Sequence, residues 1–401
     1  MTSILETQTP CLRERHAVTD ALVVVTSSFP IRGDGSEAAG SFVANVVEEL
    51  SKTLAVRVVA PGPATARELW THRVEVFRFA APDRPLSTLK PWRLHDLRWI
   101  RRVWRGGEAA TRAATEANGT ASHILALWGL PCGEWARRAA AESGMRYSVW
   151  LLGSDVWTLG RIPFLKGRLA RVIREAALAF ADGYKLADDG QRIAGVPVTF
   201  LPSTRRIDLV DPSPPRDQPP YRLLFLGRWH PNKGVDLLLD ALAMLDDDDW
   251  RGIECVEIQG GGPLDSLVRE RVRALRTAGR PVEAGRFLTK PEAEAAIARA
   301  DWVLIPSRIE SIPVVFSDAM KLGRPVIASP VGDLPQLVGN GCGVACARVD
   351  MVAICDTIRA VVKGKVEFNQ HAVNHLAAEF SLDTIAARIL NIMATAGIDG
   401  R

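Results

Sequence analysis

Two carboxylates, Glu310 and Asp318, lie eight positions apart in IPSRIESIPVVFSDAMKLGRPVIASP, residues 305–330. If the segment after Ile312 is helical, these acids are about 12 Å apart along its axis and within roughly 80° around it, so they face one groove. They cannot act on the same atom, but they can hold the two ends of an extended ligand. A nucleoside diphosphate sugar has this shape, with hydroxyl groups at each end and phosphates between them. Backbone N–H groups of Ser311 and Ile312, at the predicted helix start, favour those phosphates.

Two cations in the turn FLGRWHPNKG, residues 225–234, are candidates for binding the same phosphates. Arg228 and Lys233 are five residues apart between a predicted strand and a predicted helix. A forked guanidinium and a compact ammonium suit two adjacent phosphates, and the helix beginning near Gly234 adds N–H groups. The GxxxxGK pattern of a P-loop is absent. The alternative is that both side chains are simply solvated.

A glycine-rich turn, IQGGGPLDS at residues 258–266, follows the next predicted strand. Gly260 and Gly262 would allow backbone to come close to a ligand. Asp265 stands where the dinucleotide-binding pattern GxGxxG needs its last glycine, so a nicotinamide site is disfavoured. A tight strand-to-helix turn explains the glycines equally well.

The elements that position these groups alternate between apolar strands and amphipathic helices, which predicts an α/β protein with doubly wound sheets. In the first half the predicted strands are 21–27, 56–62, 123–129, 147–153 and 197–202, with a helix at 41–54. In the second half strands at 222–227 and 255–260 alternate with helices at 235–245 and 265–275, and the alternation continues beyond them. Two Rossmann-like domains facing across a cleft are therefore predicted.

The domain boundaries follow from breaks in this alternation. The stretch VDPSPPRDQPPY is rich in proline, which neither a strand nor a helix tolerates, so it is read as a linker or, alternatively, a surface loop. The predicted parts are a loose leader (1–20), a first domain (21–209), the linker (210–221), a second domain (222–375) and a helical end that packs back on the first domain (376–401).

Composition excludes several classes of protein. The 401 residues are 47% hydrophobic and 24% charged, which is typical of a soluble globular protein. A net charge of +4 is too small to indicate nucleic-acid binding. The sequence has neither a signal peptide pattern nor an apolar run of ~18–20 residues. Six scattered cysteines indicate a reducing cytoplasm, and Cys342 and Cys346 lack a nearby histidine that would complete a zinc site.

Four stretches resemble the GT-B glycosyltransferases of family 4. The segment 310–338 is similar to their E-x7-E region, LGRWHPNKGVDLLLDAL to their phosphate-binding turn, GGGP to their glycine turn, and 29–50 to their N-terminal glycine loop and helix. The likeness is stronger in the second predicted domain than in the first. It implies retaining transfer of a sugar from a nucleotide diphosphate sugar, bound by the donor-binding domain 222–375, to an acceptor bound by the acceptor domain 21–209, with no bound metal and no further cofactor.

The resemblance also implies roles for individual residues. Glu310 would contact hydroxyl groups of the donor sugar and Asp318 the ribose, while Arg228 and Lys233 would neutralise the leaving diphosphate. Electrostatic stabilisation of this kind contributes roughly 3 kcal/mol for a well-placed donor.

Three further residues match positions near the donor. Gly40 would approach it from the first domain. Arg286 and Phe287, after the sequence VEAG, match the strand end where the base rests, with the backbone reading it.

The sequence departs from the family pattern in the first domain. Leu152 and Leu127 occupy places where family members often have histidine, a residue suited to proton transfer. Asp155 is retained and would orient the acceptor. The missing histidines leave open a non-catalytic nucleotide-sugar-binding partner of a transferase, and a phosphorylase or epimerase on the same fold is a further alternative. The sequence does not determine the sugar, the base or the acceptor, which can be a glycan, a lipid-linked molecule or a small molecule.

The segment 90–107, KPWRLHDLRWIRRVWRGG, combines tryptophan with arginine. Leu94, Leu97, Ile100 and Val103 recur at helical spacing, and the arginines spread over the other faces. The helix either packs on its domain with extended arginines, contacts anionic lipid at the inner membrane surface, or binds a lipid-phosphate acceptor.

Two other charged stretches have alternative interpretations. Arg205 and Arg206, after the last strand of the first domain, can meet a donor phosphate or an anionic acceptor, or lie in a solvated turn. The acidic stretch LDDDDW, residues 245–250, resembles a metal-binding DxD motif, but it follows a helix and starts no strand. We therefore expect a solvated acidic loop there.

Overall fold

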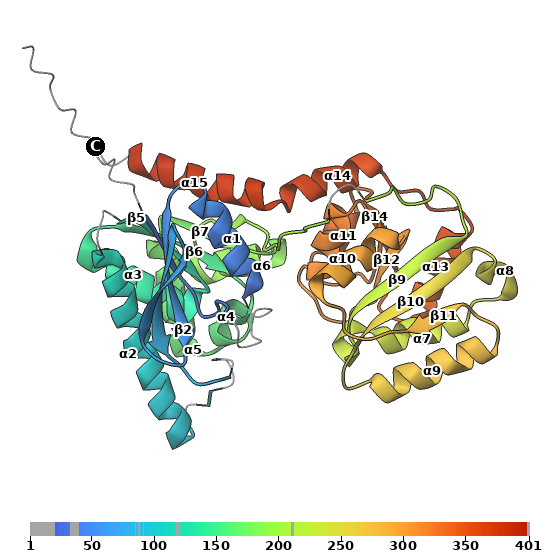
Figure 1. Ribbon diagram of the computed structural model, residues 1–401, viewed down its shortest axis with the longest axis horizontal. Helices are drawn as coiled ribbons and strands as arrows, with labels where there is room; N and C mark the ends of the chain where they lie inside the picture. The colour runs from blue at the N-terminus through green and yellow to red at the C-terminus, as the bar shows by residue number, and fades with distance from the viewer. Residues whose placement is uncertain are drawn as a thin grey trace, which may run out of the picture.

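The computed structural model describes residues 21–32, 40–84, 86, 89–90, 92–117, 121–209 and 212–398. The predicted leader, residues 1–20, lies outside this part of the chain. The described residues form two α/β domains side by side, each with a parallel sheet covered by helices (Figure 1). The prediction of two Rossmann-like domains is confirmed.

The first domain is built on an eight-stranded sheet in the order β3-β4-β2-β1-β5-β6-β7-β8. Its strands are β1 (Ala21–Val25), β2 (Ala55–Gly62), β3 (Ala66–Thr71), β4 (Val74–Ala80), β5 (Ala121–Leu127), β6 (Arg146–Leu151), β7 (Leu178–Ala181) and β8 (Thr199–Phe200). Its helices are α1 (Ser41–Ser51), α2 (Leu94–Glu116), α3 (Glu134–Ser143), α4 (Ser154–Trp157), α5 (Pro163–Glu175) and α6 (Tyr184–Ala194). Every residue of β1, ALVVV, is buried, because a central parallel strand is covered on both faces.

One strand of this sheet was not predicted. Strand β3 pairs antiparallel with β4 at the edge of the sheet, whereas the other strand pairs are parallel. Its first four residues are exposed, so its sequence ARELWT carries no apolar run that would reveal a strand.

The second domain is built on a six-stranded parallel sheet in the order β11-β10-β9-β12-β13-β14. The strands are β9 (Tyr221–Arg228), β10 (Ile253–Gly261), β11 (Val282–Ala284), β12 (Trp302–Ile305), β13 (Val326–Ala328) and β14 (Gly343–Ala345). The helices are α7 (Val235–Ala243), α8 (Asp247–Trp250), α9 (Asp265–Thr277), α10 (Lys290–Arg299), α11 (Val314–Lys321), α12 (Leu334–Val338), α13 (Met351–Val362) and α14 (Gln370–Glu379). The last helix, α15 (Leu382–Ile398), returns to the first domain.

The chain crosses between the domains twice. The first crossing follows β8 and runs to β9 without a helix or strand among the described residues of 201–220. The second lies between α14 and α15: Val373 of α14 belongs to the core of the second domain, whereas Ile385 and Ile389 of α15 pack in the core beneath α1. Figure 1 shows α15 lying along the first domain.

The acidic stretch 245–250 differs from its prediction. It contains the short helix α8, which Asp246 caps by accepting a hydrogen bond from the Asp249 N–H. Asp249 is fully buried and pairs with Arg359 (2.9 Å) and Lys363 (3.0 Å). The prediction of a solvated loop is wrong because two cations, one on the distant helix α13 and one directly after it, compensate the buried carboxylate.

No helix among the described residues has the length and apolar character needed to cross a membrane.

Candidate functional site

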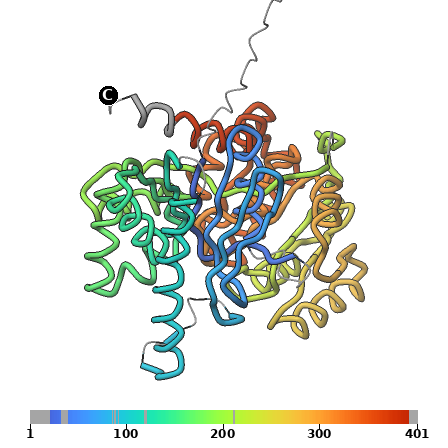
Figure 2. The backbone as a smooth tube through the Cα atoms, turned by 60° about the vertical axis from the view of Figure 1, so that its left-hand side comes forward, coloured from blue at the N-terminus to red at the C-terminus, as the bar shows by residue number. Residues whose placement is uncertain are grey.

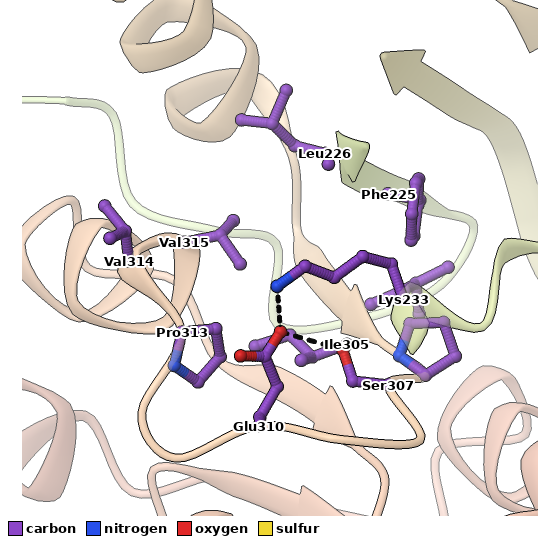
Figure 3. A pocket seen from close by; sticks show the side chains of 12 residues that line it. Phe225, Leu226, Lys233, Ile305, Ser307, Glu310, Pro313, Val314 and Val315 are labelled. Carbon is purple, nitrogen blue, oxygen red and sulfur yellow. Dashed lines mark hydrogen bonds and ion pairs between the residues drawn. The ribbon is translucent and has the colours of Figure 1, made fainter. Parts of the chain in front are cut away.

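A cavity of about 220 Å³ lies where β9 and β12 end, at the carboxyl edge of the second sheet. Loops that follow parallel strands meet at this edge, which is where α/β folds bind ligands. The cavity is lined by Phe225, Leu226, Gly227, Lys233, Leu304, Ile305, Pro306, Ser307, Glu310, Pro313, Val314 and Val315. Figure 3 shows the two charged side chains of this lining, Lys233 and Glu310, pointing toward each other.

Lys233 and Glu310 form an ion pair although 77 positions separate them in the sequence. The same Glu310 oxygen, Oε1, accepts a hydrogen bond from the Ser307 hydroxyl at 3.3 Å. The Glu310 side chain is 12% exposed and the Lys233 side chain 35%. A cation and a carboxylate in a half-enclosed cavity can bind a phosphate and sugar hydroxyl groups, respectively.

The turn that carries Lys233 is fixed by its own sequence. His230 accepts a hydrogen bond from the Asn232 N–H at 3.1 Å, and the turn ends at Gly234 with φ of 69°. A Cβ added at Gly234 would collide with the Pro306 carbonyl oxygen after β12. Glycine thus lets the two loops come together, and this close approach brings Lys233 to Glu310.

Arg228 is the last residue of β9 and follows Gly227, which lines the cavity. Its side chain is exposed and forms no ion pair or hydrogen bond with any residue that the structure describes. A free guanidinium at this position is available to an anionic ligand.

The glycines after β10 have a packing role. A Cβ at Gly260 would collide with the Gly227 carbonyl oxygen, and a Cβ at Gly262 would press on the backbone of Trp229. Both have positive φ, 152° and 145°. They therefore hold the ends of β9 and β10 together, and their approach to a ligand stays a prediction.

Arg286 and Phe287 lie in the loop after β11. Arg286 is exposed and pairs with Glu292 at 2.6 Å, and this pairing lowers the pKa of Glu292 to about 2. The Phe287 side chain is 58% exposed, and its ring lies against Gly261 so closely that a Cβ there would be 2.8 Å away. The exposed ring offers a face for stacking, and its use by a base stays a prediction.

The groove predicted to be shared by Glu310 and Asp318 is not present. Helix α11 begins at Val314, so Glu310 lies in the preceding loop and the helical rotation does not relate the two acids. Ser311 and Ile312 were predicted to lie at the helix start, but they precede it, and the contact of their N–H groups with a phosphate stays a prediction.

Asp318 is fully buried and accepts a hydrogen bond from Arg205 Nε at 2.8 Å. Lys321 is 3.7 Å from the other carboxylate oxygen. Arg205 belongs to the segment that leaves the first domain, so this pair joins the two domains. In this conformation Asp318 is closed off from the cavity, and Arg205 is occupied by a carboxylate instead of a phosphate.

Asp155 is also buried, contrary to the prediction that it orients an acceptor. Its carboxylate accepts hydrogen bonds from the N–H groups of Gly129 (2.6 Å), Val156 (3.1 Å) and Leu152 (3.4 Å). Burial raises its pKa despite these donors. Because Gly129 follows β5 and Leu152 follows β6, Asp155 fixes the loops at the ends of both strands.

Gly40 immediately precedes α1 with φ of 76°, and a Cβ there would be 2.7 Å from the Ser28 hydroxyl oxygen. Most of the glycine loop before it, residues 33–39, lies outside the described residues. The proximity of Gly40 to a donor stays a prediction.

Two polar residues at the domain contact were missed by the sequence reasoning. Asp333 of the second domain accepts a hydrogen bond from the Lys185 N–H at 3.0 Å, at the N-terminus of α6 in the first domain. Asp182 lies beside this contact, and burial, reinforced by the carboxylate of Asp155, raises its pKa to about 7. The aspartate in VGDLP resembles an ordinary helix cap, but a sequence gives no sign that it caps a helix of another domain.

Among the described residues, no group of three His, Cys, Asp or Glu side chains is arranged to hold a metal ion.

Comparisons with solved structures show which fold the chain has. Along nearly its whole length the chain is similar to sucrose-phosphate synthase from Thermosynechococcus elongatus (TM-score 0.68, 16% identity, 95% of this chain and 100% of that chain). It is also similar to Anabaena HepE in complex with UDP (TM-score 0.63, 16% identity, 94% of this chain and 100% of that chain). The chain therefore has the GT-B fold.

The sequence similarity to a described family lies in the second domain. Residues 220–363 match the family model described as Glycosyl transferases group 1. D-inositol 3-phosphate glycosyltransferase from Corynebacterium efficiens is 33% identical over 192 residues, which are 44% of each chain. Glycogen synthase from Mycobacterium tuberculosis is 28% identical over 184 residues, 44% of this chain and 43% of that protein. The matches thus span less than half the length of these relatives, and the second domain is similar to the group 1 glycosyltransferases.

Proposed function

We propose that this protein transfers a sugar from a nucleotide diphosphate sugar to a hydroxyl group of a glycan, lipid-linked or small-molecule acceptor, with retention of anomeric configuration. The observation that carries the proposal is the convergence of Lys233 and Glu310 on one cavity at the carboxyl edge of the second sheet. Structures of the similar protein HepE in complex with UDP and with UDP-glucose support a nucleotide-sugar ligand.

In the proposed reaction the bond between the anomeric carbon and the diphosphate breaks, and a bond to the acceptor oxygen forms on the same face. The acceptor hydroxyl proton passes to the departing phosphate oxygen. Lys233 and Arg228 stabilise the negative charge that develops on the leaving diphosphate, an effect of roughly 3 kcal/mol for a well-placed group. Glu310 accepts hydrogen bonds from the sugar and so fixes the anomeric carbon. This scheme uses neither a metal nor a further cofactor.

The cavity sets a condition on donor binding. Ligand sites for molecules of drug size are commonly ~300–1,000 Å³, so a cavity of about 220 Å³ is too small for the whole donor. The nucleoside would extend toward Phe287, outside the cavity. Lys233 already pairs with Glu310, so a diphosphate must displace the Glu310 carboxylate from the Lys233 ammonium. The displaced carboxylate is then free to bind the sugar. Closure of the domains would then exclude water from the reacting centre.

A titration with UDP-, GDP- and ADP-glucose tests donor binding. A ligand at a hundred times its dissociation constant adds roughly 2.7 kcal/mol to the stability of the protein, so a thermal-shift experiment should detect it. We expect one of these donors to raise the melting temperature and to release its nucleoside diphosphate when an acceptor is added. NMR of the product reports the anomeric configuration, and an inverted product would contradict the retaining mechanism. Absence of binding to all three donors would count against the donor site itself.

A second candidate is a non-catalytic nucleotide-sugar-binding partner of a transferase. Leu127 is 1% exposed, Leu152 is half-buried and Asp155 is committed to backbone amides, so these three positions offer no proton-transfer group. Donor binding without product over a broad acceptor panel would favour this candidate. Phosphate-dependent release of a sugar phosphate would instead indicate a phosphorylase. The cytoplasmic location and the absence of nucleic-acid partners stay predictions.

A further inference from the structure

Four arginines of α2 form one continuous stripe. Arg98, Arg101, Arg102 and Arg105 follow the spacing i, i+3, i+4, i+7, which places them on a single helix face. The earlier expectation that they spread over several faces is therefore wrong. Together with Gly106 they line an open hollow on the surface of the first domain. Buried residues such as Val103 and Ala110 hold the opposite face of α2 against the domain.

The described residues do not neutralise the stripe. None of its four guanidinium groups forms an ion pair with an acid in the described part of the chain, and Arg102 only stacks on Trp99 at 5.3 Å. Farther along the same helix, Arg112 pairs with Glu142 at 2.8 Å. Like charges three and four residues apart repel each other, so the unpaired stripe destabilises the isolated protein. An anionic surface would remove this repulsion.

An exposed apolar tip continues the stripe toward the start of α2. Leu94, four residues before Arg98, lies on the same face and is 80% exposed, and Trp92 just before the helix is 76% exposed. Figures 1 and 2 show that this end of α2 extends beyond the rest of the first domain. Tryptophan and leucine beside arginine are typical of segments that lie at a lipid–water interface.

The hollow has the wrong shape for a small ligand. All of its lining residues come from one helix, so there is no second wall to enclose a bound molecule. Sites for small ligands bury most of the ligand surface, whereas a flat polyanionic surface needs only one exposed face.

We propose that the stripe and its tip dock the protein on the anionic surface of a lipid bilayer. Arg98, Arg101, Arg102 and Arg105 contact the lipid phosphates, and Leu94 and Trp92 insert among the headgroups. This inference goes beyond the proposed sugar transfer and does not depend on it, because docking requires no nucleotide sugar.

Co-sedimentation with vesicles tests the docking. The probes are vesicles of phosphatidylcholine alone and of phosphatidylcholine mixed with phosphatidylglycerol, at low and high salt. We expect the full chain to bind only the mixed vesicles and to bind them less tightly at high salt. The double variant R101Q/R105Q should bind on the order of 30-fold more weakly, because each arginine contributes about fivefold near an anionic membrane.

A matched control removes two exposed arginines from the second domain. Arg273 and Arg276 of α9 also lack ion pairs among the described residues, so R273Q/R276Q changes the net charge equally. The control should bind mixed vesicles like the unchanged protein. Equal loss in both double variants, or no binding of the unchanged protein at low salt, would overturn the proposal.

Two further measurements separate docking from other outcomes. Leu94→Ser removes one of the two apolar side chains of the tip without changing the net charge, and we expect it to weaken vesicle binding at both salt concentrations. Release of the protein from mixed vesicles by millimolar glycerol phosphate, with no effect of the same concentration of chloride, would indicate a soluble anionic ligand and overturn docking. The melting temperature and donor titration of each variant report folding and the donor site separately.

Discussion

Arg205 and Asp318 join the two domains through an ion pair whose carboxylate is completely buried. Arg205 lies in the segment that leaves the first domain, and Asp318 lies on α11 of the second. The Arg205 backbone contributes as well, because its carbonyl oxygen accepts a hydrogen bond from Lys321 at 2.5 Å. The pair thus fixes the relative position of the domains next to the loop that carries Glu310.

We expect Asp318→Asn to lower the free energy of unfolding by about 3 kcal/mol, because it leaves a partly buried guanidinium without its counter-charge. Urea denaturation of the folded variant measures this change. Asp356→Asn is the control: Asp356 is 64% exposed and pairs with Arg359 on the same helix, so its loss should cost about 0.5 kcal/mol or less. Equal costs for the two variants would show that the buried pair does not stabilise the protein. A lower affinity for UDP in folded Asp318→Asn would support the contact with ribose predicted from the family resemblance.

Lys233 and Glu310 should have separable roles in the cavity. Lys233→Ala removes the cation that binds the diphosphate, so we expect both donor affinity and turnover to fall, with a loss of turnover on the order of 100-fold. Glu310→Gln removes a negative charge next to the phosphates, so it should retain donor binding while turnover falls. Calorimetry with the donor and initial rates with an acceptor measure the two effects.

Lys365→Ala is the control for this pair, since Lys365 is exposed and lies after α13, outside the cavity lining. It should leave binding and turnover unchanged. Normal turnover in both Lys233→Ala and Glu310→Gln would remove the assignment of this cavity as the donor site.

Asp182 should make the stability of the protein depend on pH. Its pKa is raised to about 7 in the folded protein by burial, followed by repulsion from the carboxylate of Asp155, whereas an unfolded aspartate has a pKa near 3.9. The folded state therefore holds this proton more tightly, and the contribution to stability is complete below about pH 4 and is lost as pH rises to about 7. Urea unfolding at about pH 5 and about pH 8 measures the effect.

We expect Asp182→Asn, which cannot ionise, to gain stability over the unchanged protein at the higher pH and to gain less or none at the lower. Asp188→Asn on the exposed face of α6 should show no such difference between the two pH values. A constant difference between Asp182→Asn and the unchanged protein across this range would contradict the raised pKa.

Gly260 should be intolerant of any side chain. A Cβ there would collide with the Gly227 carbonyl oxygen, so Gly260→Ala must separate the ends of β9 and β10. We expect a lower melting temperature and weaker donor binding, since Arg228 follows Gly227 directly. Gly279→Ala is the control, because Gly279 also has a positive φ, 77°, but no atom lies within 4 Å of the added Cβ. In that variant the free energy of unfolding should fall by only about 1–2 kcal/mol, the strain of alanine at a positive φ, and donor binding should be kept. Equal losses of stability and of donor binding in the two variants would show that backbone strain, and not the contact with β9, explains why position 260 requires glycine.

The sequence by itself was enough to predict that strands and helices alternate, and to predict which cavity residues lie in the loops after strands. Buried parallel strands such as β1 and β9 are continuous apolar runs, and the residues after them must meet at one edge of a sheet, so Lys233 and Glu310 could be predicted to be neighbours. Local patterns fail where a strand or an acid has only distant partners. Strand β3 is an exposed edge without an apolar run, and Asp249 is compensated by α13, more than a hundred positions away.

Only the tertiary structure decided which polar groups are buried and which are available. Asp155 and Asp318 have the same side chain as any exposed aspartate, but one is enclosed by the loops after two strands and the other by a second domain. The precise start of α11 also depends on the loop before it, and because Glu310 lies in that loop, helical spacing does not set its position relative to Asp318. Burial and the docking of one domain on another are sums over contacts distant in sequence, so no local spacing rule can supply them.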